Sequence, residues 1–96
     1  MSSLRLSPLA RRDLDEIWEF TATRWGTAQA EAYIRALDEA MRLVQRNPEI
    51  GDDARDVRVG YRRFPVASHV LFYRIKSTGV HVVRVLHKSM DAGRHV

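Results

Sequence analysis

VRVGYRRFPVASHVLFYRIKSTGVHVVRVLH, residues 57–87, is the stretch that decides the fold. It holds three runs rich in β-branched and aromatic residues, which predict three strands. The predicted strands are Val57–Phe64, Ser68–Ile75 and Val80–His87. Turn-like segments separate them at Pro65–Ala67 and at Lys76–Gly79. Consecutive strands with such short connections predict an antiparallel meander.

The residues before this stretch predict a short strand and a first helix. Residues 3–7 alternate between apolar and polar side chains, as in a strand. Ser7 is then a predicted helix N-cap, with Pro8 at the first helical position. The apolar residues that follow recur at three- and four-residue spacing as far as Trp25, which predicts an amphipathic helix.

Trp25-Gly26-Thr27 predicts the end of this helix and the start of a second. Gly26 is expected to take a left-handed conformation after the first helix, and Thr27 to cap the second, which stops near Asn47. So short a connection predicts an antiparallel helical hairpin. Trp18 and Trp25 lie on the apolar stripe, where core packing is their expected role.

The predicted fold is therefore α+β, of order β-α-α-β-β-β, with an antiparallel sheet packed on an α-helical hairpin. The chain length of 96 residues indicates one domain over residues 1–96. The hairpin covers one face of the sheet, which leaves the other face for solvent or a partner.

Composition excludes several classes of protein. The 45% apolar content indicates a folded chain, and the absence of cysteine excludes disulfides and thiolate metal sites. No signal peptide and no apolar run long enough for a membrane span occur, so a cytoplasmic protein without membrane contact is expected.

Positive charge is concentrated in the second half of the chain. Residues 1–50 carry seven Arg against eight acids (7 − 8 = −1), and residues 51–96 carry nine Arg or Lys against four acids (9 − 4 = +5). A nucleic acid or an acidic protein segment fits such a surface, and a solvated arginine-rich surface is the alternative. Arg62, Arg63, Arg74 and Arg84 lie in adjacent elements and are expected to gather, at least in part, into a basic patch.

Short motifs are spread along nearly the whole chain. They are Asp13-Leu14, Ile17-Trp18, Arg24-Trp25-Gly26, Asn47-Pro48, Arg58-x-Gly60-Tyr61-Arg62, Ser68-His69, Phe72-Tyr73-Arg74 and Arg84-Val85-Leu86-His87-x-x-Met90-Asp91. In order and spacing they resemble the RelE/ParE superfamily of bacterial type II toxins, and within it the ParE branch. The last motif is the most specific to that branch.

The resemblance implies the same β-α-α-β-β-β fold and a toxin that inhibits DNA gyrase. It also implies a cognate ParD-like antitoxin, held with the toxin in a hetero-oligomer. Such a toxin acts by binding, without catalytic residues, cofactor or metal, and does not by itself bind a specific nucleic-acid sequence. The related RelE branch cleaves messenger RNA on the ribosome, which is the alternative function.

The residues favour the gyrase inhibitor over the nuclease. In register with RelE-type nucleases, their meander arginine falls at Val70, their basic residue after the last strand near Ser89 and their tyrosine near His95. Phosphate cleavage needs a proton acceptor, cations and an acid, and two of these three replacements are chemically inert. His87 and His95 could instead exchange protons while Lys88, Arg84 or Arg62 brace a phosphate, so the nuclease stays as the alternative. A zinc site built from His69, His81, His87 and His95 is disfavoured.

Two sets of residues are candidates for protein contacts. The expected target-binding residues are Arg84, His87, Lys88, Ser89, Met90 and Asp91 first, and Arg58, Arg62 and Arg63 second. The alternative role of His87, Met90 and Asp91 is to fasten the C-terminus to the sheet. The expected antitoxin-binding residues are Trp18, Phe20, Trp25, Tyr33, Leu43 and Arg74.

Overall fold

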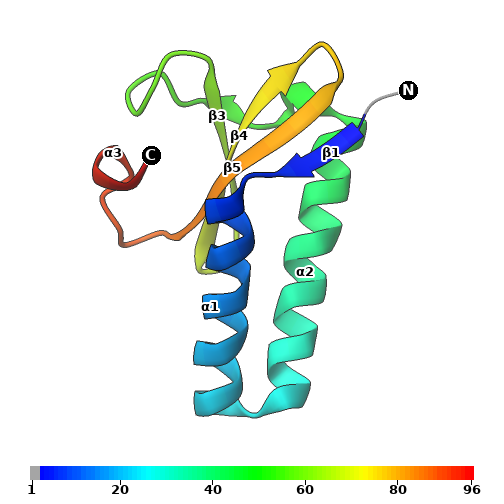
Figure 1. The fold of residues 1–96 in the computed structure, drawn as a ribbon, viewed down its shortest axis with the longest axis vertical. Coiled ribbons are helices and arrows are strands. Elements are labelled where there is room, and N and C mark those ends of the chain that lie inside the picture. Colours follow the sequence, from blue (N-terminus) through cyan, green and yellow to red (C-terminus); the bar gives the residue numbers. More distant parts are fainter. Residues whose placement is uncertain (1–2) are drawn as a thin grey trace.

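The computed structural model describes residues 3–96, and its chain forms a helical hairpin and a five-stranded sheet (Figure 1). The elements are β1 (Ser3–Leu6), α1 (Pro8–Trp25), α2 (Thr27–Arg46), the 3₁₀ turn η1 (Pro48–Ile50), β2 (Asp52–Asp53), β3 (Tyr61–Val66), β4 (His69–Lys76), β5 (Gly79–His87) and α3 (Ala92–His95). The predicted α+β order is confirmed. None of the helices within these residues is long and apolar enough to cross a membrane.

The sheet has the order β1-β5-β4-β3-β2. Strands β3, β4 and β5 pair antiparallel as predicted. Strand β2 adds a further antiparallel pair with β3, whereas β1 pairs parallel with β5. Strand β2 lies between the end of the predicted second helix near Asn47 and the first strand predicted after it, where no strand was expected. The parallel β1 covers the edge of β5 only as far as Val82, so the rest of that edge needs other partners.

Helix boundaries follow the predicted capping signals, with one correction. Ser7 Oγ accepts a hydrogen bond from the Ala10 N–H (3.0 Å), and Pro8 opens α1. Gly26 ends α1 with φ of 94°, and its N–H donates to the Ala22 carbonyl. Thr27 does not cap α2: it is the first helical residue, and Gly26 occupies the cap position without a side-chain bond.

Two strand boundaries differ from the prediction. Strand β3 begins at Tyr61 rather than Val57, because Val57 N–H bonds back to the Ala54 carbonyl in a turn. The strand then continues through Pro65, and the tight turn comes later, at Ala67 with φ of 53°. Composition alone could not separate the turn residues from the strand residues here.

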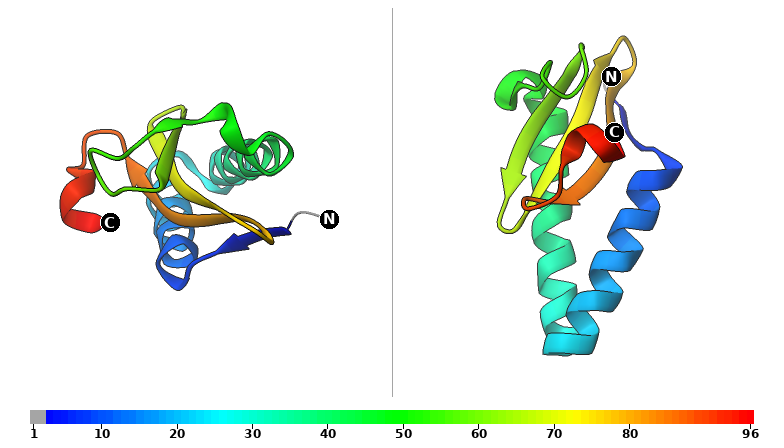
Figure 2. Two further views of the ribbon diagram at one scale, coloured as in Figure 1. Left: turned by 90° about the horizontal axis from the view of Figure 1, so that it is seen from above. Right: turned by 90° about the vertical axis from the view of Figure 1, so that its left-hand side faces the viewer.

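Apolar side chains pack on both faces of the sheet. The larger cluster fills the space between the sheet and the hairpin, and its fully buried members include Leu37, Val44, Leu71, Tyr73 and Val82. A smaller cluster on the opposite face joins Phe72 and Leu86 to the loop at Ala54 and to Ala92 of α3. The second face is thus not wholly free, because α3 lies against it (Figure 2, right).

A β-bulge in β5 changes which side chains face the hairpin. Val83 has no partner on β4 at the point where the register shifts. Val82 and Val85, three residues apart, consequently both enter the larger core, although strict alternation predicted opposite sides. A side chain outside β5 hydrogen-bonds to the backbone at the bulge: Ser7 Oγ donates to the Val83 carbonyl (2.6 Å).

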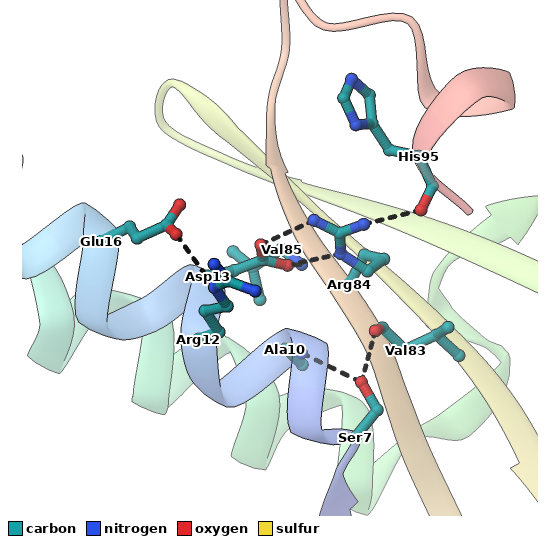
Figure 3. Close-up of polar contacts among 9 residues, drawn as sticks. All are labelled: Ser7, Ala10, Arg12, Asp13, Glu16, Val83, Arg84, Val85 and His95. Atoms are coloured by element: carbon teal, nitrogen blue, oxygen red, sulfur yellow. Dashed lines mark hydrogen bonds and ion pairs between the residues drawn. The ribbon is translucent and has the colours of Figure 1, made fainter.

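A buried ion pair joins α1 to the edge of β5 just after this bulge (Figure 3). The two Asp13 carboxylate oxygens accept from Arg84 Nε and Nη2 at 2.8 Å each, and Asp13 Oδ2 also accepts the Val85 N–H at 2.9 Å. Arg84 Nη1 donates to the His95 carbonyl of α3. The side chains are 14% (Arg84) and 9% (Asp13) exposed, and bonding to Asp13 raises the pKa of Arg84. We name this set the Asp13 clamp.

Asp13→Ala is expected to lower the free energy of unfolding by about 3 kcal/mol. The substitution leaves a nearly buried guanidinium and the Val85 N–H without a partner, and removal of one member of a buried pair is costly. Urea denaturation followed by circular dichroism measures the effect. Arg12→Ala, which breaks the exposed Arg12–Glu16 pair, is the control and is expected to cost less than about 0.5 kcal/mol. Equal, small losses for both variants would contradict a stabilising clamp.

Candidate functional site

The chain leaves β5 in a short exposed loop, residues 87–91, which we name the β5 tail. Its members are His87, Lys88, Ser89, Met90 and Asp91, all exposed. Lys88 N–H donates to the Ser68 carbonyl and Met90 N–H to the His87 carbonyl, both at 2.9 Å. Asp91 then caps α3 by accepting from the Gly93 N–H. The tail is therefore tied down at both ends while its side chains point into solvent.

Arg84, the first of the predicted target-binding residues, does not belong to this exposed set. Its guanidinium donates to Asp13 and to the His95 carbonyl, and little of it reaches solvent. The expectation of an exposed contact residue here is corrected. Arg84 lies on the part of the β5 edge that β1 leaves uncovered, and from there its guanidinium reaches Asp13 of α1.

The predicted basic patch is also divided. Arg62 and Arg63 are consecutive in β3 and so point to opposite faces; Arg62 donates to the Gly51 carbonyl, and Arg63 pairs with Asp56. Arg74 lies over the Tyr61 ring, 5.7 Å from its centroid. Arg58, exposed, lies over the same ring at 5.9 Å. Of the predicted arginines, Arg58 and Arg74 are therefore together, and Arg84 is apart from them.

Two histidines lie side by side where β4 begins and β5 ends. His69 and His87 are direct cross-strand partners, with ring centroids 5.3 Å apart and planes at 81°. The Tyr33 hydroxyl lies 2.7 Å from His69 Nδ1, and it accepts from the Ser68 N–H. Ser89 Oγ lies 2.7 Å from His87 Nδ1. A line of polar contacts thus links α2, the sheet and the β5 tail.

Two adjoining hollows surround the histidine pair. One, of about 590 Å³, is lined by Phe20, Thr21, Trp25, Gln29, Tyr33, Ser68, His69 and His87. The second shares Phe20, Thr21 and both histidines with it and extends to Met90. Together they form what we name the hairpin groove, from Trp25 near the hairpin turn to Met90 on the tail.

Large apolar side chains border this groove in an exposed position. Phe20 is 60% exposed, Trp25 69% and Met90 42%. Core packing, predicted for Trp25, is wrong, because the hairpin extends past the end of the sheet and nothing covers its turn (Figure 1). Exposed aromatic side chains gathered along a groove are typical of a protein-binding site.

The predicted antitoxin-binding residues separate into two groups. Phe20, Trp25 and Tyr33 line the hairpin groove together. Trp18 and Leu43 are half-buried and do not line it. Arg74 points away from the hairpin, so it cannot act with the groove residues on one small ligand.

The chemistry around the tail is poorly suited to phosphate cleavage. A further hollow there is lined by Arg63, Val70, His87, Lys88 and others. Val70 supplies no charge, and Asp56 neutralises Arg63 through two 2.6 Å contacts. Across residues 3–96, no group of three His, Asp or Glu side chains is arranged to hold a metal ion.

The sequence contained a signal for the Asp13 clamp that the prediction did not use. Residues 10, 13, 17 and 21 are all buried on one side of α1, so Asp13 falls inside an apolar stripe. An acid at such a position requires a buried cation or a donor, and Arg84 is both. The adjacency of His69 and His87 could not be read from the sequence without the register of β4 and β5.

His69 is expected to titrate below 6.5, the ordinary pKa of a histidine. Partial burial lowers its pKa first, and the neighbouring His87 adds to the effect, while Asp13 opposes it. Because the unfolded chain binds this proton more readily, His69 reduces folding stability as the pH falls below 6.5. An NMR titration of the His69 ring measures the pKa, and a value of 6.5 or higher would contradict the described environment.

The chain matches known toxins over nearly its whole length. The family described as "ParE toxin of type II toxin-antitoxin system, parDE" matches residues 4–92. Toxin ParE1 of Mycobacterium tuberculosis is 47% identical over 92 residues, which cover 95% of this chain and 94% of that one. Toxin ParE1 of Caulobacter vibrioides is 42% identical over 96 residues, covering 100% and 99%.

Two solved structures share the fold. A chain of the chromosomal ParDE system from P. aeruginosa superposes with a TM-score of 0.80 at 22% identity, over 91% of this chain and 96% of that one. A chain of the toxin–antitoxin complex RelBE2 from Mycobacterium tuberculosis gives 0.70 at 24% identity, over 91% and 98%. The family match and the two curated relatives identify the chain as a member of the ParE toxins of type II toxin–antitoxin systems, within the RelE/ParE superfamily.

Proposed function

We propose that this chain is a cytoplasmic toxin that inhibits DNA gyrase by binding it and is neutralised by a ParD-like antitoxin in a hetero-oligomer. The observation that carries the proposal is the β5 tail. Its exposed side chains are held on an ordered backbone, and they include the cation Lys88 and the apolar Met90. A preorganised loop loses little conformational entropy on binding, which favours a contact surface.

Exposed Arg58 is the second target-contact candidate, since Arg62 and Arg63 are half-buried and bonded within the chain. The membership in the ParE family supports gyrase as the class of target. The P. aeruginosa neighbour belongs to a ParDE system, which supports a ParD-like partner here.

The hairpin groove is the proposed antitoxin site. It offers Phe20 and Trp25 as apolar anchors, as a groove for an amphipathic helix does. His87 and Met90 belong both to this groove and to the β5 tail. An antitoxin segment in the groove would therefore cover part of the target-binding surface, which gives neutralisation by direct occlusion.

The alternative is a ribosome-dependent mRNA endonuclease, and one observation favours it: the paired His69 and His87 could serve as base and acid. RNA cleavage also requires cations that stabilise the negative charge developing on the phosphate. Asp56 neutralises Arg63, and Val70 is apolar, so neither residue supplies that stabilisation. Adding the toxin to translating ribosomes tests this directly, since mRNA cuts together with unaffected gyrase would replace the proposed function.

Substitutions in the β5 tail are expected to abolish gyrase inhibition without unfolding the protein. The double variant Lys88→Glu/Met90→Ala removes the cation and the apolar anchor, and both side chains are exposed. The measurement is the amount of cleaved DNA trapped on purified gyrase, with an expected loss of at least tenfold. Arg12→Ala, which changes an exposed residue of α1 outside the β5 tail, is the control. Full trapping by the tail variant would assign the tail a structural role alone.

Phe20→Ala/Trp25→Ala is expected to weaken antitoxin binding at least 30-fold. Buried aromatic anchors at interfaces are commonly worth about 2 kcal/mol or more. Calorimetry with the antitoxin encoded beside this chain measures the change. Leu9→Ala, an exposed apolar residue of α1 outside the groove, is the control. Equal affinities for both variants would move the antitoxin site elsewhere.

A further inference from the structure

A row of basic residues crosses the sheet on the face opposite the hairpin. Arg5 of β1 is the cross-strand partner of His81 of β5, and His81 is the partner of Arg74 of β4. Arg74 in turn faces Tyr61 of β3. Directly opposed residues share a face of the sheet, so one line of side chains runs over four adjacent strands.

The burial pattern fixes which face this is. Leu4 and Leu6, on either side of Arg5, pack on the hairpin core, as do Val80 and Val82 on either side of His81. Arg5 and His81 therefore point away from the hairpin. Lys76 lies two residues beyond Arg74 in β4 and points to the same side. We name Arg5, Arg58, Arg74, Lys76 and His81 the basic row.

The cations of this row have no acidic partners. Among residues 3–96, no ion pair includes Arg5, Arg58, Arg74 or Lys76. Three of the four acids in the second half of the chain pair with other cations: Asp53 with Arg55, Asp56 with Arg63 and Asp91 with Arg94. The fourth, Asp52, lies on β2, at the edge of the sheet farthest from Arg5, so positive charge predominates over this part of the sheet.

The pKa of His81 responds to this positive charge. Partial burial lowers its pKa first, followed by repulsion from Lys76, Arg5 and Arg74. Within residues 3–96, the charged neighbours that act on it are all positive, and its buried Nε2 has no hydrogen-bond partner. The basic row is also uncovered, since α3 packs near the other end of β5 through Ala92 and Leu86 (Figure 2, right).

We propose that the basic row binds the phosphate backbone of DNA without reading its sequence. Strands lie about 4.8 Å apart, so the row spans roughly 14 Å and places cations at intervals along a line. Repeated phosphates fit such a line, and arginine forks bind them in two contacts. An acidic peptide is the weaker candidate, because a peptide site needs apolar anchors: Ile75, the exposed apolar side chain of β4, lies on the opposite face.

The test is fluorescence anisotropy of a labelled 20-base-pair duplex of arbitrary sequence with the full-length toxin at several salt concentrations. Arg5→Ala/Lys76→Ala is expected to weaken binding at least fivefold and to reduce the slope of log K against log[salt] by about 2. Both side chains are exposed, and neither has a bonding partner to lose among the described residues, so the melting temperature is expected to be unchanged. Adding Arg74→Ala is expected to weaken binding further.

Arg11→Ala/Arg35→Ala removes the same charge from the exposed hairpin surface and is the matched control, expected to change affinity less than twofold. Equal losses of duplex affinity in both double variants would mean that only the net charge of the protein matters, which would overturn the proposal. The absence of duplex binding at low salt would also overturn the proposal. So would a result in which Arg5→Ala/Lys76→Ala loses binding to poly-glutamate, the acidic-peptide probe, while its duplex binding is unchanged. The assay contains no gyrase, so its outcome is independent of the proposed inhibitory function.

Discussion

The buried Asp13 carboxylate is the constraint on which the rest of the structure depends. Strand β1 leaves the edge of β5 at Val82, and an open strand edge beside a hydrophobic core would expose unpaired backbone groups. Asp13 accepts the Val85 N–H and the Arg84 guanidinium there, and Arg84 extends the connection to α3. One helix side chain thus replaces a neighbouring strand and fixes where the C-terminus lies.

The candidate surfaces follow from that arrangement. Holding α1 against β5 leaves the hairpin turn projecting beyond the sheet, which exposes Trp25 and Phe20 (Figure 1). The same clamp sets the direction in which the β5 tail leaves the sheet, so the tail and the hairpin border one groove. The opposite face carries the small apolar cluster of Phe72 and Leu86 near α3 and the basic row toward the start of β5. One sheet and one helical hairpin therefore present surfaces of different chemistry.

Much of the fold could be predicted from the sequence because its signals are local. Ser7-Pro8 and Gly26 mark helix ends by backbone chemistry, and alternating β-branched runs mark strands. The site was less predictable, since it depends on register. The bulge at Val83 brings both Val82 and Val85 into the larger core. Arg84 was expected to be a surface contact, but it lies at the edge of β5 that β1 leaves uncovered and there pairs with the buried Asp13. The core packing predicted for Trp25 was wrong for a different reason. An apolar stripe on a helix predicts a buried position only where another element lies opposite that part of the helix.

Amide hydrogen exchange at Val85 is the most direct measurement of the Asp13 clamp. This N–H lies beyond the end of the β1 pairing and donates to the Asp13 carboxylate. We predict that it exchanges as slowly as the amides of the buried strands, through global unfolding. In Asp13→Asn, we predict faster exchange at Val85 while those strands keep their protection. Exchange of Val85 in the unmodified protein as fast as that of exposed loop amides would contradict a clamp that holds α1 to this edge.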